Sequence, residues 1–188
     1  MVRVARILAA LAAVLLSAEA ALADSIETKA RLCASCHGAH GLPSDPSVPI
    51  IGGQQSAYIL KQLNDYRNGD RSSQIMSSIA ESLSEGDVAQ MAAYFSNARW
   101  PARAESPLPT APQVIATCQA CHHPNLAGGV SPSGVAPRLA GQFSPYLIDT
   151  MTAYTDGERA NSTVMPALMQ SLKPADRKAI ADYLAAMR

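Results

Sequence analysis

Two short segments of this sequence share one arrangement of cysteine and histidine. The first reads CASCH and the second CQACH, and together they contain all four cysteines of the 188-residue chain. The residues concerned are Cys33, Cys36 and His37 in the first segment and Cys118, Cys121 and His122 in the second. Cys-x-x-Cys-His is the attachment signature of c-type haem. The two thiols add across the porphyrin vinyl groups, and the histidine binds the iron as its proximal ligand. The pattern therefore predicts two covalently bound haem c groups.

Three other uses of paired cysteines explain the pattern less well. A disulfide framework is common in exported proteins, but it does not require a histidine after each pair. Zinc motifs rarely place a histidine directly after the second cysteine. A thioredoxin-like redox pair is expected once, in a βαβ setting, whereas this motif occurs twice.

The first residues of the chain predict export. Arg3 and Arg6 precede an apolar run over residues 7–16, and small residues lead up to Ala23. This is the three-part pattern of a secretory signal peptide, here residues 1–23, with cleavage after Ala23. The apolar run is shorter than the ~20 residues of a transmembrane helix, and an uncleaved N-terminal anchor is the alternative. We therefore expect a periplasmic protein, which agrees with covalent haem attachment after export.

The charge of the remaining chain is nearly balanced. After the predicted cleavage, 13 basic and 14 acidic residues remain, which gives a net charge of −1. Such a balance gives no reason to expect a nucleic-acid partner. Residues 24–188 contain no apolar stretch long enough for a membrane helix. Any membrane association is therefore expected to be peripheral and to occur through protein partners.

The sequence around the two motifs is duplicated. Gly53-Gln54, for example, recurs as Gly141-Gln142, 88 residues later. Such self-similarity indicates two copies of one structural unit. The predicted boundaries are 24–97 for domain 1, 98–112 for a proline-rich extended linker and 113–188 for domain 2. The four prolines of the linker disfavour regular structure there.

Each domain is predicted to be a small helical fold around one haem, so the fold class is all-α. A first helix ends at the haem motif, over residues 25–36 and 112–121. A second begins at Ser56 or Ser144 as N-cap and ends near Gly69 or Gly157. A third runs from Ser84 through Tyr94, or from Lys173 to Tyr183. No alternating strand pattern competes with these helices.

The second axial ligand of each iron decides the chemistry. A methionine raises the reduction potential, whereas an open position permits ligand binding or catalysis. Met76 and Met165 occupy the same place in both copies, in a segment predicted to be a loop. They follow the haem histidines by 39 and 43 residues, and Pro166 stiffens the second segment. We therefore predict Met76 and Met165 as axial ligands.

Other methionines and histidines fit this role less well. Met91, Met151 and Met187 are predicted to be packing residues, because most methionines fill cores. Met169 is the rival of Met165, but its counterpart in the first copy is Ala80.

The histidines outside the haem motifs, His40 and His123, lie too near those motifs in sequence to reach the opposite haem face and are predicted at the surface. The carbonyls of Pro49 and Pro137, 88 residues apart, are candidates to accept a hydrogen bond from the proximal histidines.

The tandem CxxCH units, the Gly-Gln segments, the Tyr-x-x-Gly-x-Arg helices and the methionine segments resemble the dihaem cytochromes of the cytochrome c4 family. The resemblance covers nearly the whole chain after the predicted signal peptide. It implies two class I cytochrome c domains with His/Met-ligated haems that face each other near the domain interface. It assigns Cys33, Cys36, His37 and Met76 to the first haem and Cys118, Cys121, His122 and Met165 to the second. The first methionine segment departs from the second in lacking a proline.

These features favour an electron-transfer protein over an enzyme. Two saturated irons leave no place for a substrate, and a dihaem peroxidase would need a displaceable ligand. The expected partners are a quinol-oxidising complex or a dehydrogenase as donor and a terminal oxidase as acceptor. The alternative is the haem-bearing subunit of a larger enzyme, such as a flavocytochrome sulfide dehydrogenase.

Overall fold

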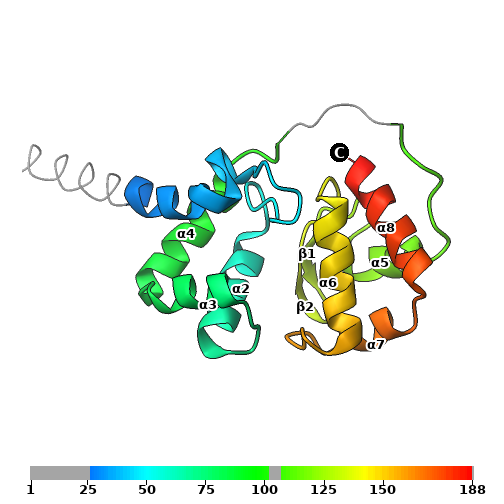
Figure 1. Ribbon diagram of the computed structural model, residues 1–188. Coiled ribbons are helices and arrows are strands. Elements are labelled where there is room, and N and C mark those ends of the chain that lie inside the picture. The colour runs from blue at the N-terminus through cyan, green and yellow to red at the C-terminus, as the bar shows by residue number, and fades with distance from the viewer. Residues whose placement is uncertain (1–25, 102–106, 188) are drawn as a thin grey trace, which may run out of the picture.

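The computed structural model describes residues 26–101 and 107–187. The predicted signal peptide and part of the predicted linker lie outside these residues. The described part of domain 1 holds a helix over residues 26–37, the 3₁₀ turn η1 (Ala39–Gly41) and the helices α2 (Ser56–Asn68), α3 (Gln74–Glu81) and α4 (Glu85–Asn97). Domain 2 holds α5 (Ile115–His122), β1 (Gly129–Ser131), β2 (Gly134–Ala136), α6 (Ser144–Asp156), α7 (Met165–Gln170) and α8 (Pro174–Ala186). The two sets of elements form two lobes side by side (Figure 1). This confirms the predicted fold class, whereas the exact domain boundaries stay predictions.

Local signals fix most helix ends where the sequence predicted them. The Ser84 hydroxyl accepts a hydrogen bond from Asp87 N at 3.2 Å, and the Asp87 carboxylate accepts one from Ser84 N at 3.1 Å. This capping box starts α4. At the other end of the long helices, Gly69 and Gly157 adopt left-handed φ values of 81° and 80° and end α2 and α6.

The predicted N-caps of α2 and α6 are wrong by one residue. Gln55 and Phe143 occupy the N-cap positions, and neither side chain caps its helix. Ser144 instead donates to the Asp182 carboxylate of α8 at 2.6 Å. Its hydroxyl therefore joins two helices of domain 2, a tertiary contact that the local sequence does not reveal.

Domain 2 contains a two-stranded antiparallel hairpin that the sequence analysis did not predict. β1 pairs with β2 from Gly129 opposite Ala136 to Ser131 opposite Gly134. Its strands are three residues long, too short to show an alternating pattern. The hairpin lies between His122 and Pro137, which are 15 residues apart, whereas the equivalent His37 and Pro49 of domain 1 are 12 residues apart.

Each domain has a hydrophobic core of its own. In domain 1, α2 packs on α4 around Ile59, Met91 and Phe95. In domain 2, α6 packs on α8 around residues that include Leu147 and Ile180. Within the part of the chain that the structure describes, no helix has the length and hydropathy needed to cross a bilayer.

Candidate haem sites

Both predicted haem motifs open onto one cavity of about 990 Å³ that extends over the two domains. The helix over residues 26–37 brings Cys33, Cys36 and His37 to it, and α5 brings Cys118, Cys121 and His122. Met76 and Met165 line the same cavity. The structure thus brings together all eight predicted site residues, and most of the surrounding side chains are apolar.

The two haem-motif histidines are buried and held by backbone carbonyls. His37 Nδ1 lies 2.9 Å from Pro49 O, and His122 Nδ1 lies 2.9 Å from Pro137 O, which confirms the predicted contacts. Burial lowers the pKa of both imidazoles, and the carbonyl contacts oppose this shift. A neutral imidazole whose Nδ1–H donates to a carbonyl has its lone pair on Nε2. That nitrogen is therefore available to bind a metal ion.

All four cysteines are free thiols in the structure. Burial raises the pKa of the Cys33 and Cys118 thiols, so neither resembles the low-pKa thiol of a redox-active pair. Among the described residues, no group of three or more His, Cys, Asp or Glu side chains is placed to hold a metal ion.

The segments that carry the two methionines are short helices, so the predicted loops are wrong. Met76 is the third residue of α3, and Met165 is the first residue of α7. Ser73 accepts a hydrogen bond from Met76 N at 3.3 Å, and Ser162 accepts one from Met165 N at 3.2 Å. A serine that accepts from a first-turn N–H stabilises a helix start. The same serine–methionine arrangement thus fixes both segments.

The other methionines lie where packing residues are expected. Met91, Met151 and Met169 are at most 6% exposed and belong to the two hydrophobic cores, although they also reach the cavity wall. Met187 packs against the core of domain 2. Because their equivalents in the other copy are different residues, Met76 and Met165 are the methionines that occur in both domains at one position.

His40 and His123 are both exposed, as predicted. His123 Nε2 contacts Val130 O at 3.0 Å and so helps to hold the hairpin. Neither ring is part of the cavity wall.

The residues present fit haem c. Each domain offers two free thiols next to a neutral imidazole, together with a thioether on a separate short helix, and all face an apolar cavity. Imidazole nitrogen and methionine sulfur are the axial ligands of low-spin cytochromes c.

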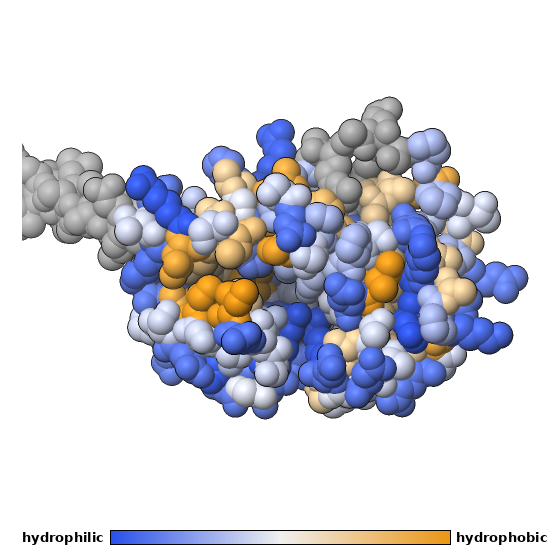
Figure 2. Space-filling model, viewed as in Figure 1, coloured by the Kyte–Doolittle hydropathy of each residue, from blue (hydrophilic) through white to orange (hydrophobic). Residues whose placement is uncertain are grey.

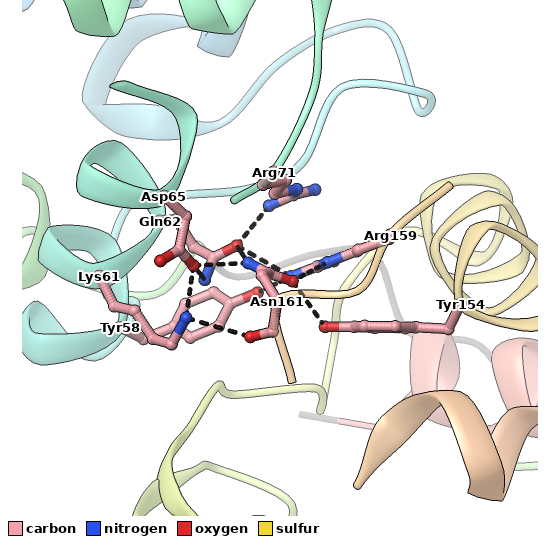
Figure 3. Close-up of polar contacts among 8 residues, drawn as sticks. All are labelled: Tyr58, Lys61, Gln62, Asp65, Arg71, Tyr154, Arg159 and Asn161. Carbon is pink, nitrogen blue, oxygen red and sulfur yellow. Dashed lines mark hydrogen bonds and ion pairs between the residues drawn. The ribbon is translucent and has the colours of Figure 1, made fainter. Parts of the chain in front are cut away.

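A polar network joins the two domains, and sequence reasoning gave its members no role (Figure 3). Arg159 of domain 2 donates to the Tyr58 hydroxyl of domain 1 at 3.0 Å and lies over the ring of its own Tyr154 at 4.6 Å. Arg71 makes the equivalent contacts from domain 1. It forms a hydrogen bond with the Tyr146 hydroxyl of domain 2 and lies 4.7 Å from the ring of Tyr66 in its own domain.

Burial raises the pKa of Tyr66 and Tyr154 to about 12, so both phenols are neutral at neutral pH. The backbones of Arg71 and Arg159 also form a bridge to each other. The 88-residue repeat of these tyrosines and arginines is the signal from which the interface could have been predicted.

The comparisons with known proteins agree with this geometry. The Cytochrome c family model matches residues 111–188. A cytochrome c4 of Pseudomonas aeruginosa is 30% identical over 84% of this chain and 85% of its own length. A thiosulfate dehydrogenase electron acceptor of Stutzerimonas stutzeri is 32% identical over 95% of this chain and 93% of its own. The crystal structure of reduced recombinant cytochrome c4 from Pseudomonas stutzeri superposes with a TM-score of 0.74 at 27% identity, covering 88% of this chain and 98% of that one.

The chain belongs to the cytochrome c4 family. It is an electron-transfer cytochrome with haem c as its cofactor, as the sequence predicted.

Proposed function

We propose that this cytochrome c4 homologue carries electrons in the periplasm between a dehydrogenase or quinol-oxidising complex and an acceptor such as a terminal oxidase. The observation that supports this most is the pair of equivalent donor sets on one cavity. His37 and Met76 would ligate the first iron, and His122 and Met165 the second. With both positions filled in each domain, the protein passes electrons and transforms no substrate.

The side chains of each domain have separate parts in this function. Bound haem c supplies one-electron exchange between ferrous and ferric iron. The cysteines hold it covalently, and Pro49 and Pro137 fix the orientation of the two imidazoles. The apolar wall of the cavity excludes water, which keeps the local dielectric low.

A dehydrogenase as donor is favoured by one of the relatives. The Stutzerimonas protein, 32% identical, is by its name an electron acceptor of thiosulfate dehydrogenase. We propose the same class of partner for this chain, either as a diffusing donor or in a stable complex. Stopped-flow mixing of the oxidised cytochrome with a thiosulfate dehydrogenase and thiosulfate tests it, because reduction of both haems within the turnover time is expected.

Carbon monoxide tests the ligand assignment. It binds ferrous haem at an open or displaceable position, so the reduced protein should show no spectral change when the gas is added. A change in half of the haem would show that Met76 or Met165 is not a firm ligand. Turnover of added peroxide would likewise replace the carrier function with a catalytic one.

A further inference from the structure

Two glutamines from the repeated Gly-Gln segment lie buried between the domains. Gln54 is 5% exposed and Gln142 is 3% exposed. A buried carboxamide costs free energy unless its donors and acceptors are paired, so its partners indicate what it is for. In both cases the partners include backbone groups of the opposite domain.

Gln142 of domain 2 holds a single residue of domain 1. Its Oε1 accepts from Ile50 N at 3.0 Å, and its Nε2 donates to Ile50 O at 3.0 Å. The same Oε1 accepts from Phe143 N at 3.0 Å, which fixes the carboxamide from its own side. Ile50 is 1% exposed, so water does not compete for these bonds.

Gln54 of domain 1 makes the same contacts in the opposite direction. Its Oε1 accepts from Arg138 N at 2.7 Å and from Gln55 N at 2.9 Å. Its Nε2 donates to Arg138 O at 3.0 Å. Ile50 and Arg138 are 88 residues apart, as are the two glutamines, so one arrangement occurs twice about a pseudo-twofold axis.

The residue held in each case follows the proline that contacts the haem-motif histidine. Pro49 C=O and Ile50 N–H belong to one peptide group. His37 Nδ1–H donates to that carbonyl at 2.9 Å, and the N–H on the other side donates to Gln142 Oε1. A continuous chain of hydrogen bonds therefore runs from the histidine of domain 1, through one peptide group, to a side chain of domain 2.

The equivalent series of hydrogen bonds starts at the haem-motif histidine of domain 2. His122 Nδ1 contacts Pro137 O at 2.9 Å, and Arg138 N of the same peptide group donates to Gln54 Oε1 at 2.7 Å. Each haem-motif histidine is thus connected to the opposite domain and not only to its own.

The turns that present the two glutamines are constrained. Gly53 and Gly141 have φ values of 73° and 79°, which side chains rarely adopt. Their N–H groups donate at 2.8 Å to Phe95 O and to Leu184 O, at the last helix of each domain. A Cβ on either glycine would clash with Trp100, at 2.6 Å from its N or 2.7 Å from its Nε1. The two turns that carry the glutamines are therefore fixed by their contacts with the last helix of each domain and with Trp100.

We propose that Gln54 and Gln142 are positioning residues that tune the haem of the opposite domain. Hydrogen bonds in series polarise one another, so the Ile50 N–H···Oε1 bond makes Pro49 C=O a stronger acceptor. A stronger acceptor on Nδ1–H makes the imidazole a more basic iron ligand. A more basic ligand favours ferric iron and lowers the reduction potential. Docking of the two domains thereby sets the potential of both haems, each through the other's glutamine.

This inference rests on the proposed ligation of iron by His37 and His122. The carbon monoxide test separates the two ideas. A haem that binds the gas in the wild-type protein contradicts the proposed ligand set. A cross-domain effect that is missing in a protein unreactive to the gas contradicts only the tuning.

The decisive variants are Gln142→Met and Gln54→Met, which keep the side-chain length and remove the hydrogen bonds. Redox titration followed by NMR, with the haem methyl signals assigned to each domain, reports the two potentials separately. Gln142→Met should raise the midpoint of the haem in domain 1 and shift that of domain 2 by much less. Gln54→Met should do the converse. The ring Nδ1–H signal of His37 should move in the first variant and that of His122 in the second.

Asn161→Ala is the matched control, because it removes contacts between the domains that touch neither hydrogen-bond chain. It should leave both ring signals in place. The proposal would be contradicted if either glutamine variant shifted the potentials of both haems equally, or if the control gave the same shifts. The effect would then come from a general loosening of the interface. Should a glutamine variant fail to fold, hydrogen exchange on the wild-type holoprotein remains. The Ile50 and Arg138 amides should be protected to the same degree as helix amides, and rapid exchange of both would contradict the proposal.

Discussion

Domains 1 and 2 carry the same site residues on the same elements, yet they differ in two insertions. Domain 2 has three more residues between its haem histidine and the proline whose carbonyl contacts it, in the segment that holds the β1–β2 hairpin. It also has one more residue between its arginine and the serine whose hydroxyl accepts from the methionine N–H. Arg71 and Ser73 are two positions apart, whereas Arg159 and Ser162 are three apart. Neither insertion alters the contacts of the histidines or the glutamines.

The single-residue insertion makes one half of the interface different from the other. The extra position holds Asn161, whose Nδ2 donates to Gln62 Oε1 at 3.1 Å and to Asp65 Oδ2 at 2.5 Å. At the equivalent place across the pseudo-twofold axis, Ser73 and Thr150 line a polar cavity of about 270 Å³. The duplicated unit therefore keeps the hydrogen bonds to each haem-motif histidine and varies the contacts around them.

The cavity rims differ as well. Leu32 and Ile75 of domain 1 line the cavity and are 52% and 63% exposed. Their equivalents in domain 2 are Thr117 and Val164, the latter 41% exposed. Figure 2 shows a larger apolar patch over domain 1 than over domain 2 on the visible face. The rim of domain 1 therefore offers the more apolar surface.

Removal of the predicted axial ligands should have the largest effect, and it should affect one haem at a time. Met76→Ala should let carbon monoxide bind the reduced haem of domain 1, and Met165→Ala that of domain 2, because each change leaves one iron position open. Each variant should show a change in half of the haem spectrum, and the double variant in all of it. Met91→Ala is the control and should not react. A response of the Met91 variant equal to that of Met76→Ala would show that the ligand is misassigned.

Loss of the interface arginines should destabilise the protein unequally. Arg159 donates to Tyr58, Gln62 and Asn161 and is 4% exposed. Hydrogen bonds of a charged group contribute ~1.5–3 kcal/mol, so Arg159→Met should lower the free energy of unfolding by about 3 kcal/mol. Arg71→Met should cost less, about 2 kcal/mol. Denaturant unfolding of the two holoproteins measures the difference, and an equal or inverted order would contradict the asymmetry assigned to the interface.

The serine hydroxyls that accept from the two methionine N–H groups should contribute equally to stability in the two domains. Ser73→Ala and Ser162→Ala each remove one hydroxyl that accepts from the methionine N–H. Each should cost ~1 kcal/mol, the usual net value of one hydrogen bond. Thermal unfolding checks this, with Ser78→Ala, whose hydroxyl lies within α3, as the control. A loss in only one domain would show that the two helix starts are not equivalent.

The smallest effect is expected for the loss of stability when acid protonates the Asp87 carboxylate. The hydrogen bond from Lys29, with further bonds at Ser84, lowers the pKa of the Asp87 carboxyl. A lowered pKa in the folded state stabilises the protein above the unfolded value of ~3.9, and this contribution disappears as the pH falls through the folded value. Wild-type protein and Asp87→Asn should therefore differ in melting temperature at pH 6 and converge on acidification.

Asp176→Asn, at the equivalent place in domain 2, tests whether the capping contact alone carries this effect, since Asp176 accepts from Lys173 N. A difference between wild type and Asp87→Asn that persists unchanged at pH 3 would contradict the assignment to ionisation.

The haem-attachment motifs, the duplication and most helix ends could be predicted from the amino-acid sequence alone. These depend on neighbouring residues: the spacing of Cys33, Cys36 and His37, the Ser84–Asp87 capping box and the glycine that ends each second helix. The proline carbonyl contacts were predictable too, because the same proline recurs 88 residues later.

The contacts between the domains and the helical form of the methionine segments depend on the folded structure. The contacts of Gln142 and Arg159 connect positions some 90 to 100 residues apart, and their energies arise only when the two domains meet. The methionine segments became helices because a single serine hydroxyl satisfies each first turn, a signal too short to detect before the chain is folded. The repeat showed that these residues matter in pairs, but only packing revealed that each serves the opposite domain.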